Sequence, residues 1–193
     1  IEWTPNMMPE GLTARIAYSP NHAGGASNDK AYSGASTSAG SGYDVTLSAT
    51  DAIHGMAGLT IDAGISEKNQ AGNANTDGDV SENTIALTYA VGSFTVGYQM
   101  SEEDTGLTGT TEYENTMYSV TFNVNDDLSI GYNNYESEQD NTTDVTAEAA
   151  SLQIAYTMGG ASIRLAQASI DNAKYQTTTD YDRDATTLSV SLA

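Results

Sequence analysis

The side chains with the strongest chemistry are scarce in this sequence. Cysteine is absent, and the only histidines are His22 and His54. Disulfides and thiolate metal sites are therefore excluded, and so is a histidine-rich metal site. We find no Ser-His-Asp arrangement, no catalytic pair of carboxylates and no glycine loop of the kind that cradles phosphate. The sequence therefore predicts a protein that is not an enzyme.

Carboxylates are the abundant charged group. There are 26 Asp and Glu residues against 6 Lys and Arg residues, which gives a formal net charge of −20. A protein that binds nucleic acid needs Lys and Arg to contact the phosphates, so this balance argues against a nucleic-acid partner. The same balance is compatible with a surface that attracts divalent cations.

Two acidic segments offer oxygen ligands for such a cation. NTDGDVSEN, at 75–83, places Asp77 and Asp79 on either side of Gly78, and SEEDTG, at 101–106, carries three acids in succession. Calcium binds carboxylate oxygens, but neither segment has the twelve-residue ligand spacing of an EF-hand. Asp77 and Asp79 are thus a candidate Ca2+ site in an external loop. The alternative is an ordinary solvated acidic loop.

Most of the chain alternates between apolar and polar side chains. This period of two is typical of β-strands, and no helical pattern competes with it. In YAVGSFTVGYQM, at 89–100, only Gly92 and Ser93 separate two alternating runs, as in a β-hairpin. The opening IEWT would end one strand, and ten more are predicted at 12–19, 42–50, 57–66, 83–91, 93–101, 114–124, 127–137, 146–158, 160–170 and 182–193.

The connections between the predicted strands alternate in length. In an antiparallel meander, every second connection lies at the same end of the sheet. One end would therefore carry short turns and the other long acidic loops, as in outer-membrane barrels and unlike Greek-key sandwiches. The short connections are 6–11, 51–56, 92–93, 125–126 and Gly159, and the long ones are 20–41, 67–82, 102–113, 138–145 and 171–181.

One face of the predicted strands is apolar and the other is small and polar. Val96, Ile130 and Leu165 belong to the apolar face. Ten or more strands closed with that face inside would leave a lumen too wide to fill, since about eight strands is the packed limit. We therefore predict one domain over 1–193, an all-β, antiparallel up-and-down transmembrane β-barrel with lipid outside and water inside. The charged residues predicted to line its pore are Arg15, Asp44, Asp62 and Arg164.

Three segments carry a likeness to a known family. They are the hairpin YAVGSFTVGYQM at 89–100, the turn YTMGGASIRLA at 156–166 and the closing run DRDATTLSVSLA at 182–193. These segments resemble bacterial outer-membrane porins, and most of all the acidic general porins of alphaproteobacteria. The last strand of that family ends in an aromatic residue, usually Phe, whereas this chain ends at Ala193.

The resemblance implies a barrel of about 16 strands, of which about five, with the pore-constricting loop, would precede Ile1. The chain would then be the C-terminal portion of a porin truncated at its N-terminus. The resemblance also implies a homotrimer in the outer membrane of a Gram-negative bacterium, in contact with the lipid bilayer and with lipopolysaccharide. Ions and small hydrophilic solutes would diffuse passively through its water-filled channel.

In porins of this class, basic residues on the wall oppose acids on the constricting loop. The resemblance therefore implies that Arg15 and Arg164 tune ion passage, and that Asp44 and Asp62 supply a preference for cations. The alternative is that each charge only pairs with a neighbour on the wall. Two other functions stay open: a non-channel outer-membrane barrel, such as an adhesin or an enzyme, and a soluble or assembling extracellular β-protein. Extraction without detergent would mark the last of these.

Overall fold

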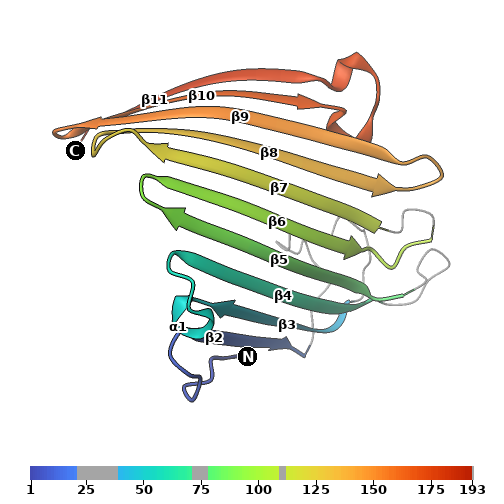
Figure 1. Cartoon of the computed structure of the whole chain (residues 1–193). Helices are drawn as coiled ribbons and strands as arrows, with labels where there is room; N and C mark the ends of the chain where they lie inside the picture. Colours follow the sequence, from blue (N-terminus) through green and yellow to red (C-terminus); the bar gives the residue numbers. More distant parts are fainter. Residues whose placement is uncertain (21–38, 71–77, 109–111, 193) are drawn as a thin grey trace.

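The computed structural model describes residues 1–20, 39–70, 78–108 and 112–192. These residues form one antiparallel sheet in which every strand pairs with its neighbours in sequence (Figure 1). The strands are β1 (Glu2–Trp3), β2 (Leu12–Ser19), β3 (Ala39–Ala49), β4 (Leu59–Gln70), β5 (Val80–Val91), β6 (Phe94–Asp104), β7 (Glu112–Asn123), β8 (Leu128–Asp140), β9 (Val145–Met158), β10 (Ala161–Asp171) and β11 (Arg183–Leu192).

All eleven predicted strands are confirmed, and the up-and-down order is the predicted one. Several strands run further toward the long connections than the sequence predicted. β4 extends to Gln70, and β6 extends to Asp104. The prediction that Glu102, Asp104 and Glu138 lie in loops is therefore wrong, because all three lie in paired strands. Apolar residues mark the alternation only within the apolar band, whereas the hydrogen-bonded pairing of the strands continues beyond that band.

The short turns follow from local backbone chemistry. Gly92 and Ser93 connect β5 to β6 between the paired residues Val91 and Phe94. Gly92 has a φ of 57°, which glycine adopts without steric cost and which two-residue hairpins of this kind require.

The connection at 51–56 contains a short helix that the sequence did not predict. This helix, α1 (Asp51–His54), ends at Gly55, whose φ of 76° is left-handed and whose N–H donates to the Asp51 carbonyl at 2.7 Å. No helix in the described ranges is long and apolar enough to cross a membrane.

The apolar side chains point away from the polar face and stay exposed. Val96, Ile130 and Leu165 have exposed fractions of 41%, 36% and 42%. Within the described residues, the buried hydrophobic side chains are only Ala14, Val80 and Ala147. The sheet therefore has no dry core of its own, and its apolar face needs an apolar solvent. The register joins that face into continuous rows, for example Phe94, Phe122, Ile130, Ile154, Leu165 and Leu188 from β6 to β11.

Candidate functional site

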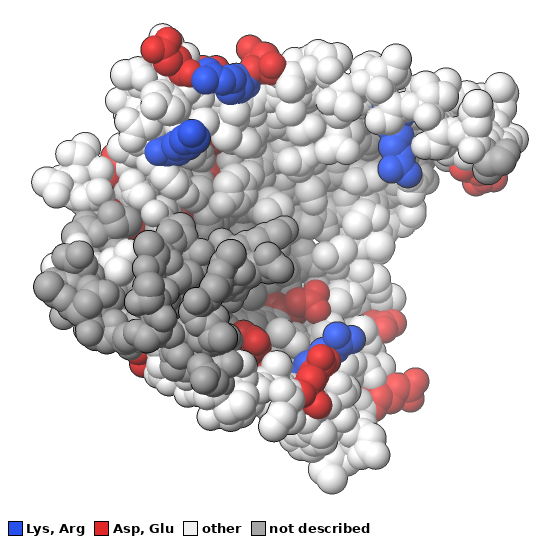
Figure 2. Space-filling model, turned by 180° about the vertical axis from the view of Figure 1, so that it is seen from behind, with Lys and Arg blue, Asp and Glu red and all other residues white. Residues whose placement is uncertain are grey.

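The polar face of the sheet is concave. Figure 2, which views the molecule from behind, shows it as a hollow with acidic side chains inside. Successive residues of a strand point to opposite faces, so each strand presents every second residue to this hollow. From Glu82 to Leu87 on β5 and from Phe94 to Glu103 on β6, the concave side chains are half-buried and their convex neighbours are exposed, as curvature crowds one face and opens the other. We take this concave face as the candidate functional site.

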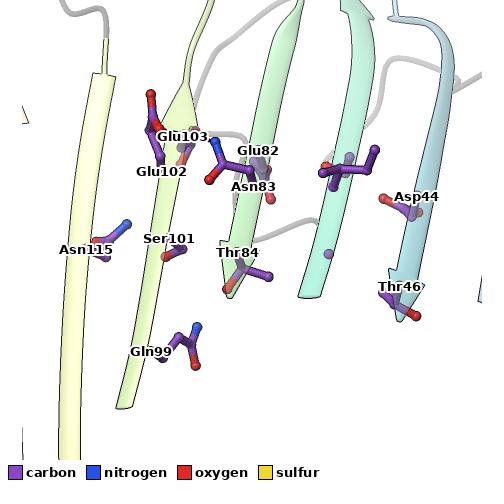
Figure 3. Close-up of a pocket in the computed structure, with 13 residues that line it drawn as sticks. Asp44, Thr46, Glu82, Asn83, Thr84, Gln99, Ser101, Glu102, Glu103 and Asn115 are labelled. Carbon is purple, nitrogen blue, oxygen red and sulfur yellow. Dashed lines mark hydrogen bonds between the residues drawn. The ribbon is translucent and has the colours of Figure 1, made fainter. Parts of the chain in front are cut away.

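An acidic row is the most strongly charged part of the concave face. The pairing places Asp44 opposite Ser66, Ser66 opposite Glu82, and Glu82 opposite Glu103. Three carboxylates from β3, β5 and β6 thus stand in one line across the sheet. They line a hollow of about 430 Å³ whose other polar lining includes Thr46, Thr84, Gln99, Ser101 and Asn115 (Figure 3).

The four predicted pore-lining residues all lie on this concave face. Arg15, Asp44 and Asp62 come together on β2, β3 and β4. Arg15 and Asp62 line a second hollow of about 560 Å³ that adjoins the acidic row. Arg164 lies apart on β10, opposite Ala155 of β9 and Ser189 of β11.

Sequence reasoning missed two residues of the acidic row, Glu82 and Glu103. It assigned both to long loops, because apolar side chains no longer mark the alternation there. The sequence did contain a signal for both. Alternate residues of a strand share a face, so Glu82 shares the face of Thr84, and Glu103 shares the face of Gln99 and Ser101, even where no apolar residue marks the opposite face. The same count places Lys68 and Arg183 on the concave face.

The two halves of the concave face carry different charges. Strands β2–β6 present four carboxylates there, together with the cations Arg15 and Lys68. Among the described residues of β7–β11, this face carries no carboxylate, and its only cations are Arg164 and Arg183. Among the described residues, negative charge on the concave face is thus confined to β2–β6, and hydroxyl, amide and alanine side chains make up most of the rest.

The candidate metal site is only partly described. Asp77 lies outside the described residues. Asp79 accepts a hydrogen bond from Asn69 Nδ2 at 2.6 Å. In SEEDTG the acids alternate between faces, with Glu102 and Asp104 convex and Glu103 concave, so the three do not converge. Among residues with described placement, no group of three or more acids or histidines is arranged to hold a metal ion.

The convex face carries a second acidic region, beyond the apolar band and toward the long connections. Glu102, Glu114 and Glu138 stand directly opposite one another on β6, β7 and β8, and Asp104, Glu112 and Asp140 form the next row. Like charges in direct cross-strand pairs repel each other. This convex acidic band therefore favours cations close to the protein.

Comparison with known proteins decides the family. The model of a family described as Gram-negative porin matches residues 1–172. This chain belongs to the Gram-negative porin family. Porins of that family reside in the bacterial outer membrane, so the apolar convex face of this porin is covered by lipid. Among curated proteins, none matches this porin.

Solved structures show the same fold at low sequence identity. A porin refined at 1.8 Å resolution matches with a TM-score of 0.71 at 16% identity, and the match covers 98% of this chain and 59% of the other. An anion-selective porin from Comamonas acidovorans matches with a TM-score of 0.64 at 14% identity, covering 88% of this chain and 48% of the other. This chain thus spans between about half and three fifths of the length of these structures.

Proposed function

We propose that this porin forms a water-filled channel through which ions and small hydrophilic solutes diffuse passively, with a preference for cations. No covalent step is involved. The observation that carries this proposal is the acidic row of Asp44, Glu82 and Glu103 across the concave face. Among the solved porins that share its fold, the one from Comamonas acidovorans is described as anion-selective. The acidic row of this chain favours the opposite sign.

The row is compact enough for its charges to act together. Neighbouring strands lie about 4.8 Å apart, so β3 and β6 are separated by about 14 Å. The Debye length in physiological salt is about 8 Å, so the fields of adjacent carboxylates overlap in the hollow. Each carboxylate attracts a monovalent cation at 4 Å by about 1 kcal/mol in water. The row therefore raises the local concentration of cations and lowers that of anions.

The other pore-lining residues take supporting roles in this proposal. Asp62 adds to the negative potential beside the row, and Arg15 opposes it locally. Arg164, four strands from Glu103, acts on its own part of the wall. Neither Arg15 nor Arg164 has an ion-pair or hydrogen-bond partner among the described residues, so both guanidinium groups are available to the water path.

The proposal extends to the surroundings of the barrel. Divalent cations, Ca2+ included, would sit on the convex acidic band and bridge it to the phosphates of lipopolysaccharide, which relieves the repulsion within each row. The loop of Asp77 and Asp79 would bind the same ions. The proposal includes a homotrimer, which membership of the porin family supports. Chelation with EDTA should lower the unfolding temperature in native outer-membrane lipid, and Ca2+ should restore it. An unfolding temperature that is the same with and without EDTA would contradict the proposed role of divalent cations.

The experiment that tests the channel itself is conductance of the full-length protein in a planar bilayer. Discrete steps are expected at low voltage. Absence of steps at every voltage would overturn the channel and favour an adhesin or another non-channel barrel. Extraction of the protein from cells without detergent would instead favour an extracellular β-protein.

A further inference from the structure

The connection between β10 and β11 is far longer than a hairpin needs. The two strands stay paired as far as Ile170 and Arg183, where a short turn would close them. Instead, the chain forms two short 3-10 helices, η1 (Ala173–Tyr175) and η2 (Thr179–Tyr181), as Figure 1 shows at the ends of these strands. We call residues 172–175 the strap.

The strap crosses the sheet sideways over the concave face. Asn172 Nδ2 donates a hydrogen bond to the Thr146 carbonyl of β9 at 2.9 Å. The Tyr175 hydroxyl lies 2.7 Å from Ser137 Oγ of β8, and its ring lies 5.3 Å from the ring of Tyr113 on β7. The strap thus reaches from β10 to β7, a lateral distance of about 14 Å at the usual strand spacing.

The backbone of the strap is held in a shape that most residues avoid. Asn172, Lys174 and Tyr175 have φ values of 53°, 60° and 57°, all in the left-handed region. Side chains with a Cβ disfavour this region, and three such residues within four positions do not persist without contacts that impose them. The tyrosine and asparagine contacts supply that restraint.

The anchor under Tyr175 is a closed network of neutral groups. Ser137 is 2% exposed and donates its single hydroxyl proton to Asn115 Oδ1 at 2.6 Å. The Tyr175 hydroxyl is therefore the donor in its bond to Ser137. Tyr135 also donates to Asn115 Oδ1, at 2.5 Å. Because no member of the network is charged, salt does not screen it as it screens the acidic row.

From these contacts we infer that the strap is a fixed part of the channel wall that narrows its outer mouth, and that Tyr175 limits the size of the solutes that enter. This inference rests on the proposed function, because only a channel has a mouth to narrow. The strap lies over the half of the concave face that has no described carboxylate, whereas the acidic row occupies the other half. Size selection and charge selection therefore belong to different sectors of one wall.

The first arm of the test locates the strap without measuring transport. Residues 1–193 contain no cysteine, so Ser137→Cys introduces the one thiol of this part of the protein, with a side chain of nearly the same shape. In the full-length protein in vesicles, a water-soluble maleimide should label this thiol slowly while Tyr175 is present. Tyr175→Ala should accelerate the labelling several-fold. Tyr181→Ala changes a tyrosine of the same connection that lies outside the anchor network; it is the matched control and should leave the rate unchanged.

The second arm measures solute entry by the swelling of proteoliposomes in sugars of increasing size. Tyr175→Ala should admit larger sugars and raise the single-channel conductance, Tyr175→Phe should do so partly, and Tyr181→Ala should do neither. Fast labelling of Ser137→Cys in the presence of Tyr175, or unchanged sugar entry after the thiol is uncovered, would overturn the inference. A third outcome separates the two proposals. If Ser137→Cys stays shielded but the parent protein conducts nothing, the strap is in place as described, but the proposed channel function is wrong. The size-limiting role of the strap is then wrong as well.

Discussion

The two halves of the sheet, β2–β6 and β7–β11, are alike on the convex face and different on the concave face. Both halves present an apolar band of the same kind, with Val96 in one half and Leu165 in the other similarly exposed. On the concave side, the first half carries the acidic row and the second carries a neutral network beneath the strap. Lipid requires apolar side chains on the convex face of every strand, whereas the concave face can carry different polar or charged residues from one strand to the next. The concave face is therefore where the properties of this particular porin are encoded.

The largest expected effect tests the shared convex face. Val96→Arg and Leu165→Arg should each destabilise the full-length protein in a bilayer by about 2–4 kcal/mol, because each turns a cation toward the membrane interior. The matched substitutions Thr95→Arg and Ala166→Arg point the same charge into the lumen and should cost little. Urea unfolding in vesicles measures all four. A small cost at Leu165 alone would show that the second half does not face lipid.

A smaller effect should separate the two halves on the concave face. Arg15→Glu adds an acid beside Asp44 and Asp62, and should raise the cation-to-anion permeability ratio about two- to fivefold, equivalent to on the order of 0.4–1 kcal/mol. Arg164 lies four strands from Glu103, about 19 Å across the sheet, and its cross-strand row reaches Ser93, just before β6 and ten residues from Glu103, so the two charges are separated by more than the screening length. Arg164→Glu should therefore shift the ratio less.

Reversal potentials in a salt gradient give both ratios. Equal shifts would mean that the acidic row does not act as a local unit. No shift for Arg164→Glu would remove that residue from the pore lining.

The smallest effect concerns the strap and pH. Burial raises the pKa of the Tyr175 phenol. A raised pKa in the folded state means that the neutral phenol is favoured, so the strap's stability is fully present below the ordinary value of 10.0 and is lost as pH rises through the higher folded value. Conductance should rise slightly in strongly alkaline solution. The same rise in Tyr175→Phe, which cannot ionise, would contradict this origin.

Nearly all of the fold and part of the candidate site could be predicted from the sequence. The alternation of apolar and polar residues predicted every strand, and it placed Arg15, Asp44, Asp62 and Arg164 on the correct face. It could do so because the apolar, lipid-facing residues mark every second position of a strand. Glu82 and Glu103 were missed where apolar markers end but pairing continues. The contact of Tyr175 with Ser137 joins residues 38 positions apart through an irregular connection, so no local pattern signals it.

The central claim is that water and ions pass along the acidic row of the concave face. Its most direct test is the reversal potential of the full-length protein in a salt gradient, measured for the parent and for two variants in which acids of the concave or of the convex face are neutralised. The parent protein should favour cations. Asp44→Asn with Glu82→Gln and Glu103→Gln should move the potential most of the way toward zero. The convex triple variant, Glu102→Gln with Glu114→Gln and Glu138→Gln, should leave it nearly unchanged. A potential of anionic sign in the parent, or an equal loss from the convex variant, would contradict a water path along the acidic row.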